Sequence, residues 1–346
     1  MRRKRNTGII LTAAAIVVAI LSASPSGAAE PVFSGDTVLG ITIHGDFYRL
    51  EKSPDSGSEV EGVIELAEGT RIPAKISKYG ISRLSVCQVA PLKLTLSREA
   101  AAGTPLADLQ IVRFVPPCHF DDEYQEYAAL EYLVYRSYQV LASPAVRVRP
   151  VDFVLRDIDR KRTFHKGFGY LVEDLTHTAD RTGFTWLDIQ SPDPGDLDVA
   201  HLTTLVLFQY MVGNTDWSVV RGSRGERCCH NMAVFGAETE GSNTLVPFDF
   251  DQAGLVNAPY ATVDERLGIR RVTQRLYRGF CWQNDQLPRA VEHFNSKRAE
   301  IEALFNRIDL PSPRARKHAL KYLEAFYTTI NDSRKLQKKI LSQCRD

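Results

Sequence analysis

The first third of the chain alternates apolar and polar positions over short runs. Between residue 32 and about residue 120, these runs are separated by Gly, Pro and Ser, as half-buried antiparallel strands usually are. The clearest runs are residues 37–43, 62–66, 72–76, 92–96 and 109–115. The pattern predicts a β-rich region at the front of the protein.

Helical spacing becomes prominent further along. Residues 121–141 and 198–212 carry apolar side chains at intervals of three and four, which predicts two helices. Two strand-like runs, 146–155 and 167–172, lie between them. From residue 264 onwards the pattern is mostly helical, with interruptions at 282–286 and 311–313.

A β-rich front with one helix, followed by a helix-rich back, predicts an α+β protein with two lobes. We place the first lobe at residues 30–173 and the second, helical lobe at residues 174–346. The second lobe would carry the loops with the candidate chemistry.

The first 29 residues form a separate segment with the pattern of a signal peptide. Arg2, Arg3, Lys4 and Arg5 precede an apolar stretch of about 15 residues, and small residues follow up to Ala29. We predict cleavage after Ala29 and an exported protein, periplasmic or extracellular, with no membrane span after cleavage. An uncleaved anchor is the alternative.

Charge narrows the range of partners. The chain has 43 basic and 42 acidic residues, and four of the basic ones lie in the signal segment. The remainder is therefore mildly acidic, which argues against nucleic-acid binding, because neutralising phosphates requires a basic surface.

Six cysteines are present, and none forms a CxxC pair. In an oxidising compartment an even number of cysteines indicates disulfides rather than a zinc site. We predict one bridge between Cys87 and Cys118 and another between Cys281 and one of the adjacent pair Cys228 and Cys229.

The strongest chemical signal lies between residues 213 and 254. Asp216 follows an apolar helix, Asn231 comes later, and Asp249 and Asp251 lie two positions apart within an apolar run. If that run is a strand, the two aspartates share one face, since side chains at i and i+2 point the same way. Two carboxylates side by side indicate a hard cation such as Mg²⁺ or Mn²⁺.

These motifs resemble the CotH-like atypical protein kinases and, more distantly, the HipA type. The matching segments are Gly-Asn-x-Asp ending at Asp216, His-Asn ending at Asn231, and Asp-Phe-Asp starting at Asp249. Upstream, the segment 78–83 is similar to the family's Arg-Gly-x-Ser segment. The segment ending at Glu173 is similar to its Gly-x-Tyr-x-x-x-Glu. The resemblance covers roughly residues 71–254.

The resemblance implies a bilobal protein-kinase-like fold, with one helix in the β-rich N-lobe and a mainly helical C-lobe. It also implies transfer of a phosphoryl group from ATP, or another nucleoside triphosphate, to a protein hydroxyl with Mg²⁺ or Mn²⁺. Asp216 matches the catalytic aspartate, while Asn231 and Asp249 match the metal ligands. Asp251 is a further candidate metal ligand.

The resemblance is less definite about the residues that hold the nucleotide. Lys93 is the first candidate for the phosphate-binding cation and Arg113 is its competitor, while Glu173 would lead into the nucleotide-binding hinge. The acidic partner of the cation should come from the helix 121–141. Glu131 is preferred there, because it lies on the apolar face of that helix.

Two other functions stay open at this stage. The same fold could be catalytically silent and serve as a binding or scaffold module of the cell envelope. The same carboxylates could instead hydrolyse a phosphoester with a metal ion. Arg275 and Arg278, in an arginine-rich run, are expected on a solvated helix face, with Arg275 as a possible contact for an anionic substrate.

Overall fold

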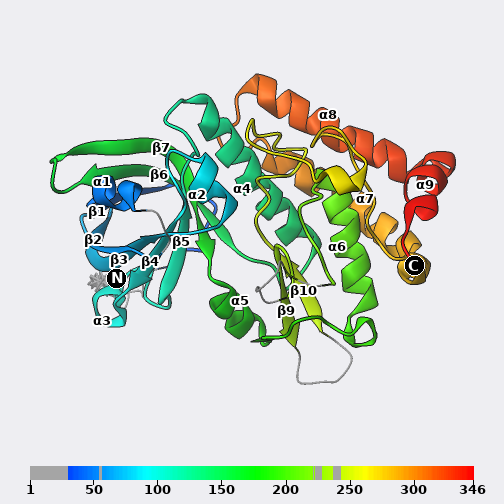
Figure 1. Ribbon diagram of the computed structural model, residues 1–346, viewed down its shortest axis with the longest axis horizontal. Coiled ribbons are helices and arrows are strands. Elements are labelled where there is room, and N and C mark those ends of the chain that lie inside the picture. Colours follow the sequence, from blue (N-terminus) through cyan, green and yellow to red (C-terminus); the bar gives the residue numbers. More distant parts are fainter. Residues whose placement is uncertain (1–29, 54–56, 221, 223–227, 237–242) are drawn as a thin grey trace, which may run out of the picture.

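Seven strands from the first half of the chain close into a barrel in the computed structural model (Figure 1). The structure describes residues 30–53, 57–220, 222, 228–236 and 243–346, so the predicted signal segment lies outside the described residues. Around the barrel the strand order is β1-β2-β3-β4-β5-β7-β6. The strands are β1 (Leu39–Gly45), β2 (Glu59–Leu66), β3 (Arg71–Lys78), β4 (Leu92–Leu96), β5 (Ile111–Val115), β6 (Val148–Asp157) and β7 (Arg162–Glu173).

Closure of the barrel depends on one long-range pairing. β1 pairs antiparallel with β2 and parallel with β6, with Ile41 opposite Phe153 in the second pairing. The alternating apolar side chains of the strands point inward and form their own hydrophobic cluster, with Ile43, Ile72 and Leu94 fully buried. The predicted alternation is therefore explained by the barrel interior.

The predicted bilobal kinase-like fold, with a single helix in its β-rich lobe, is wrong. The strands form a closed barrel, and the described residues before 173 include four helices rather than one. They are α1 (Phe47–Lys52), α2 (Ser82–Val86), α3 (Arg98–Ala101) and α4 (Glu123–Leu141). Alternation indicates which residues face inward, but not which distant strands pair. For that reason the return of β6 to β1 was not visible in the sequence.

The second half of the chain is helical around a small three-stranded sheet. Its helices are α5 (Leu175–Thr182), α6 (Val199–Val212), α7 (Leu287–Leu304), α8 (Pro313–Ile330) and α9 (Ser333–Lys339). Short 3₁₀ turns are η1 (Pro194–Asp196), η2 (Glu265–Leu267), η3 (Cys281–Gln286) and η4 (Leu341–Gln343). The sheet has the order β10-β9-β8, from β8 (Thr185–Trp186), β9 (Met232–Gly236) and β10 (Thr244–Pro247).

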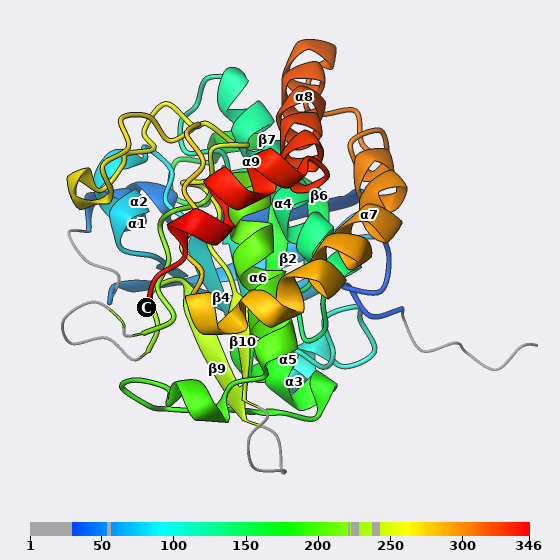
Figure 2. The ribbon, with the colours of Figure 1, turned by 90° about the vertical axis from the view of Figure 1, so that its right-hand side faces the viewer.

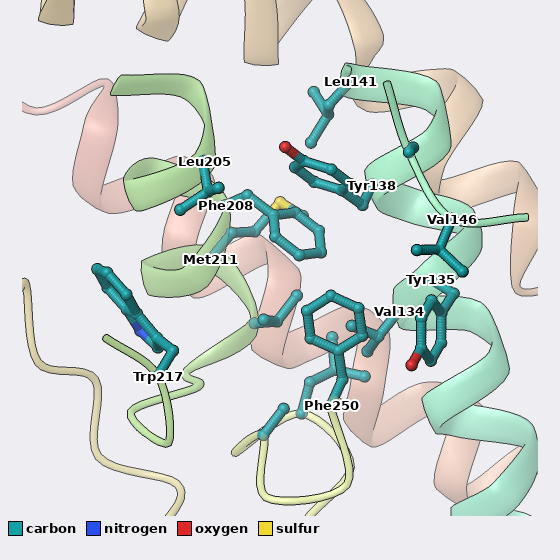
Figure 3. Packing of buried hydrophobic residues seen from close by; sticks show 14 of the residues in the cluster. Val134, Tyr135, Tyr138, Leu141, Val146, Leu205, Phe208, Met211, Trp217 and Phe250 are labelled. Carbon is teal, nitrogen blue, oxygen red and sulfur yellow. The ribbon is translucent and has the colours of Figure 1, made fainter. Parts of the chain in front are cut away.

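The two long predicted helices are confirmed as α4 and α6. In Figure 1 α4 lies between the barrel and α6, and in Figure 2 α7 and α9 lie in front of α6, on its side away from the barrel. Figure 3 shows Tyr138 of α4 and Phe208 of α6 packed together above Phe250. This second hydrophobic cluster therefore fixes α4 against the loop that carries the aspartates.

Two details of the predicted helical region need correction. Residues 264–280 are mostly irregular, and regular helix begins only with η3 and α7. The break before Pro313 is confirmed, because α7 ends at Leu304 and α8 begins at Pro313. No helix among the described residues combines the length and the apolar character needed to cross a bilayer.

Three disulfides involve all six cysteines. The predicted Cys87–Cys118 bridge is confirmed. The predicted pairing of Cys281 is wrong: Cys281 bonds to Cys344, and Cys228 bonds to Cys229. The C-terminal segment explains this pairing. The backbone of Arg345 hydrogen-bonds to the backbones of Gly279 and Cys281, and this brings Cys344 next to Cys281.

Candidate functional site

A pocket lies where the barrel, α2, α4 and the segment after β10 meet. Its apolar walls come from barrel strands and connecting segments: Pro91, Val115, Val146, Val172 and Phe248. Its polar lining is Tyr79, Ser82, Arg83, Arg113, Glu131, Tyr135 and Asp249. Three of the residues singled out in the sequence, Arg113, Glu131 and Asp249, therefore line one cavity.

Arg83 of α2 is the centre of the charged end of the pocket. Its side chain is only 7% exposed. One guanidinium nitrogen, Nη2, lies 2.5 Å from Glu131 Oε2 and 3.6 Å from Asp249 Oδ1. Nε donates to Asp251 Oδ2 at 2.9 Å. Three acidic side chains thus surround one guanidinium.

The charge balance of this cluster follows from its burial. Burial alone would lower the pKa of Arg83, but the carboxylates of Asp251 and Glu131 outweigh it and raise that pKa well above its usual value. The guanidinium therefore stays charged. Burial raises the pKa of Glu131, and the charge of Arg83 only partly offsets this effect. The acids outnumber the buried base, so the cluster favours a further cation.

The predicted strand through Asp249 and Asp251 is wrong. β10 ends at Pro247, and Asp249 has a φ of 59°, in the left-handed region, so the two aspartates do not share a strand face. Asp251 is 1% exposed and bound to Arg83. The cation found beside these carboxylates is a guanidinium, whose Nε is bonded to Asp251 Oδ2. The role of Asp251 as a metal ligand stays a prediction.

Asp249 is the more exposed of the two acids of this cluster that line the pocket. Its backbone N–H donates to the Tyr135 hydroxyl at 2.8 Å, which fixes the turn against α4. Its carboxylate is 39% exposed. Partial removal from water and the negative charge of Asp251 raise the pKa of Asp249 well above its usual value, and Asp216 adds to the effect.

Asp216 is presented by a tight turn after α6. The helix ends with Gly213 at a φ of 68°, where a Cβ would come within 2.0 Å of the Tyr322 hydroxyl, so the position requires glycine. The side chain of Asn214 then accepts a hydrogen bond from the backbone of Asp216 at 3.0 Å. The resulting Asx turn leaves the carboxylate of Asp216 41% exposed.

His230 and Asn231 hold this carboxylate from the other side. His230 Nε2 lies 2.8 Å from Asp216 Oδ1, and Asn231 Nδ2 donates to Asp216 Oδ2 at 3.0 Å. The backbone carbonyl of Asn231 accepts a hydrogen bond from the backbone N–H of Phe248 at 3.1 Å. The end of the β9–β10 hairpin therefore places Asn231 next to Asp249, although 18 positions separate them in the sequence.

The acceptor groups on this side of the pocket are of the kind that a hard cation uses. Asp249 and Asp216 carry carboxylates whose charges act on each other, and Asn231 turns its amide nitrogen towards Asp216. In the described part of the chain, no group of three or more His, Cys, Asp or Glu side chains is arranged to hold a metal ion. Mg²⁺ commonly uses one or two carboxylates and completes its shell with water and substrate phosphates, so the donor set fits an ion that arrives with a nucleotide.

The other end of the pocket is formed by Arg113 on β5. Its Nη2 lies 2.9 Å from Asp174 Oδ2, and its guanidinium carbon lies 4.5 Å from the centre of the Tyr79 ring. Lys93, the first candidate for the nucleotide-binding cation, is paired with Arg113 across β4 and β5 but does not line the pocket. The partner of Glu131 is neither of these residues but Arg83.

Glu173 is placed away from the pocket lining and is fully buried. It accepts hydrogen bonds from the side chains of Arg181 and Thr178, and from the backbone of Arg147. Burial acts to raise the pKa of Glu173, but the hydrogen bonds and charge of Arg181 hold it below its usual value. Its observed contacts are those of a structural ion pair at the junction of β7 and α5.

Sequence reasoning missed two arginines. Arg83 belongs to the 78–83 segment, but the acids that pair with it in the interior lie 48 and 168 positions away in the sequence. No local pattern therefore predicts that this arginine is buried. Arg278 was expected in solvent, yet it donates to the carbonyls of Thr215 and Trp217 and so braces the Asp216 turn. Arg275, the candidate contact for an anionic substrate, donates instead to backbone carbonyls of Met211 and Tyr322.

Comparison with known proteins adds no family name to this geometry. No protein-family model matches the chain, and no curated protein matches its sequence.

Proposed function

We propose that this chain transfers the terminal phosphoryl group of a nucleoside triphosphate to a hydroxyl group, with a divalent cation as cofactor. One observation carries the proposal: an apolar pocket ends at Asp249, whose turn is hydrogen-bonded to the Asn231 segment that also holds Asp216. Such a pocket suits a nucleotide base, and the adjoining oxygen ligands suit its phosphates.

In this proposal Asp216 orients the acceptor. Its exposed carboxylate accepts the proton of the attacking hydroxyl as the acceptor oxygen bonds to the γ-phosphorus. The bond from that phosphorus to the β,γ-bridging oxygen breaks, and the nucleoside diphosphate leaves with the electron pair. His230 and Asn231 fix the direction of the Asp216 carboxylate. A bound Mg²⁺ or Mn²⁺ would neutralise charge on the phosphates, with Asp249 and Asn231 as its protein ligands.

The acceptor implied by the sequence resemblance is a protein hydroxyl, and the proposed location is outside the cytoplasm. The three disulfides support export, because such bonds persist in oxidising compartments. The proposed signal segment at residues 1–29 accords with that location.

A binding module without catalysis is the second candidate. A specific observation favours it: both arginines that line the pocket are already paired with carboxylates, Arg83 with Glu131 and Asp251, and Arg113 with Asp174. A pocket of this kind can hold a ligand without a free cation at the transferring phosphate.

Phosphoryl transfer from γ-labelled nucleotide in the presence of Mn²⁺ separates the two candidates. We expect label to be transferred to a protein acceptor. Asp216→Asn should lower the rate by about a hundredfold or more, as loss of a positioned acid–base group does. Asp249→Asn should also lower it, because the cation loses a carboxylate ligand. The matched control is Asp309→Asn, an exposed aspartate outside the pocket, which should label like the wild type.

Other results would support other functions. Nucleotide-induced stabilisation without any label transfer would favour the binding module. Release of phosphate from a simple phosphoester in the absence of nucleotide would favour a hydrolase. Absence of any nucleotide-induced thermal shift at millimolar concentration would refute the proposed phosphotransferase.

A further inference from the structure

The hairpin of β6 and β7 ends in a turn that is rich in basic side chains. Arg156, Arg160, Lys161, Arg162 and Lys166 lie in or beside this turn, and all five are exposed. None of the five forms an ion pair with a described residue. Figure 1 shows the turn at the left end of the molecule, away from the helical half. These cations therefore face solvent without a counter-charge from the described part of the chain.

The acidic residues of the turn do not neutralise this surface. Asp157 is fully buried, and its two carboxylate oxygens accept hydrogen bonds from the backbone of Tyr48 and Arg160, at 3.1 and 2.7 Å. Asp159 is the exposed acid of the turn. The neighbouring helix α1 and its N-cap together carry two basic and two acidic residues. The excess of positive charge therefore belongs to the hairpin turn itself.

Tyr48 of α1 holds two of the guanidinium groups in place. The guanidinium carbon of Arg160 lies 3.6 Å from the centre of the Tyr48 ring, and that of Arg162 lies 4.9 Å from it. Arg162 also donates a hydrogen bond to the Tyr48 hydroxyl. Because the ring already restricts both side chains, less conformational entropy is lost when they bind an anion. The two arginines are thus preorganised for phosphate groups.

An exposed apolar side chain lies at the same turn. Ile158 is 47% exposed, next to the exposed Asp159 and close in sequence to the fixed Arg160. A single exposed isoleucine is ordinary on a protein surface. Together with several unpaired cations, however, it gives the amphipathic character of surfaces that bind lipid. In such surfaces the apolar side chain enters the headgroup region, and lysine and arginine bind anionic headgroups.

The position of these side chains favours a membrane over an acidic protein. A stable protein interface buries about 800 Å² on each partner and requires a complementary face. The basic side chains instead surround the end of a hairpin, so a partner must adapt to a tip (Figure 1). A fluid bilayer adapts in this way, and its surface offers many phosphates at once to the five cations.

We infer that the β6–β7 turn docks this protein onto an anionic lipid membrane. Ile158 enters the headgroup region, while Arg160 and Arg162 bind lipid phosphates. The inference does not depend on the proposed function, because none of the residues that carry it lines the pocket.

Sedimentation with lipid vesicles tests the inference. The processed chain is recovered after export, so that residues 1–29 do not contribute to binding. It is mixed with vesicles of equal parts phosphatidylcholine and phosphatidylglycerol, and with vesicles of phosphatidylcholine alone. We expect partition onto the anionic vesicles that decreases as salt is added, since salt screens exposed charges, and much weaker partition onto the neutral vesicles.

Charge variants make the test specific to the turn. Arg160→Gln/Arg162→Gln should weaken partition onto anionic vesicles by about thirtyfold, the factor for two basic residues near such a surface. The matched control is Lys338→Gln/Lys339→Gln on α9, at the opposite end of the molecule, which changes the net charge equally and should bind like the wild type. Asp159→Asn should strengthen partition by about fivefold, because it removes the exposed acid.

Ile158→Ser distinguishes a bilayer from other polyanions. It should weaken partition onto the anionic vesicles but leave binding to polyglutamate unchanged, because only a bilayer takes up the apolar side chain. Binding to polyglutamate without binding to vesicles would overturn the inference and indicate an acidic protein as the partner.

Two further results would also overturn the inference. One is the absence of partition onto the anionic vesicles. The other is an equal loss of partition in the hairpin and α9 double variants, which would indicate a general effect of charge. If the hairpin double variant does not fold, Asp159→Asn still decides, because misfolding does not explain a gain in binding that salt abolishes. Unchanged partition of Asp159→Asn would then count against the turn.

Discussion

At the scale of single residues, the stability of this protein depends on how its buried charges are compensated. Arg83 compensates Glu131 and Asp251, and without it two acids would be buried with no counter-charge. His165 is the opposite case, a buried titratable group that forms no ion pair with a described residue. It is 8% exposed, its ring packs edge-on against Phe120 and Phe153, and its Nε2 has no hydrogen-bond partner among the described residues.

His165 should make the free energy of unfolding decrease as the pH falls from 6.5 to about 4. Burial lowers the pKa of His165 from 6.5 to about 4. Between these values the unfolded state binds more protons than the native state, so the free energy of unfolding decreases as the pH falls. We expect His165 to account for a loss of about 2 kcal/mol, less than the full shift because the ring is partly solvated.

Chemical denaturation of the wild type and His165→Leu at pH 7 and pH 4.5 measures this contribution. The stability difference between the two proteins should shift in favour of the variant at the lower pH. A difference that is the same at both pH values would contradict the prediction.

At the scale of elements, Glu173 joins the last barrel strand to the first helix of the second half. It ends β7, and it receives hydrogen bonds from α5 through Thr178 and Arg181. His177, one turn before Arg181, lies 2.7 Å from the same carboxylate. The orientation of α5 relative to the barrel therefore depends on one buried acid.

Replacing Glu173 by Gln should lower the free energy of unfolding by about 3 kcal/mol, because Arg181 then loses its counter-charge in a buried site. The matched control is Asp180→Asn, an exposed acid on the same helix, which should change stability by less than about 0.5 kcal/mol. Denaturant titration of both variants checks the prediction. Equal effects at the two positions would mean that the buried ion pair contributes no special stability.

At the scale of the whole molecule, the C-terminal segment is covalently attached to the helical half. The Cys281–Cys344 bridge closes a loop with a sequence separation of 63 residues, whereas Cys228 and Cys229 are adjacent. A disulfide limits the unfolded chain more when its loop is longer. The two bridges should therefore contribute very differently to stability.

The double variant Cys281→Ala/Cys344→Ala should lose about 4 kcal/mol of unfolding free energy, according to the loop-entropy relation. Cys228→Ala/Cys229→Ala provides the comparison and should lose less, because the adjacent bridge restricts almost no chain. Thermal unfolding of both variants, with and without a reducing agent, measures the difference. A larger loss for the adjacent pair would refute the loop argument.

The sequence predicted those features of the site that depend on neighbouring residues. The apolar helix 198–212 placed Asp216 directly after a helix end, and the position of Glu131 on the apolar face of α4 indicated its need for a cation. It gave the wrong geometry for Asp249 and Asp251, since a left-handed residue ends the expected strand. It also left the identity of the cation open, because Arg83 reaches this cluster only after folding.

The sequence by itself indicated the alternating runs of the barrel strands and the two long helices α4 and α6, because alternation and helical spacing are local properties of the chain. It also determined which residue types are available for chemistry. Only the tertiary structure decided that β1 pairs with β6 to close a barrel, that Cys281 meets Cys344, and that Arg83 lies among three acids. Each of these contacts joins residues far apart in the chain, and their partners are selected by packing and burial, which no local pattern encodes.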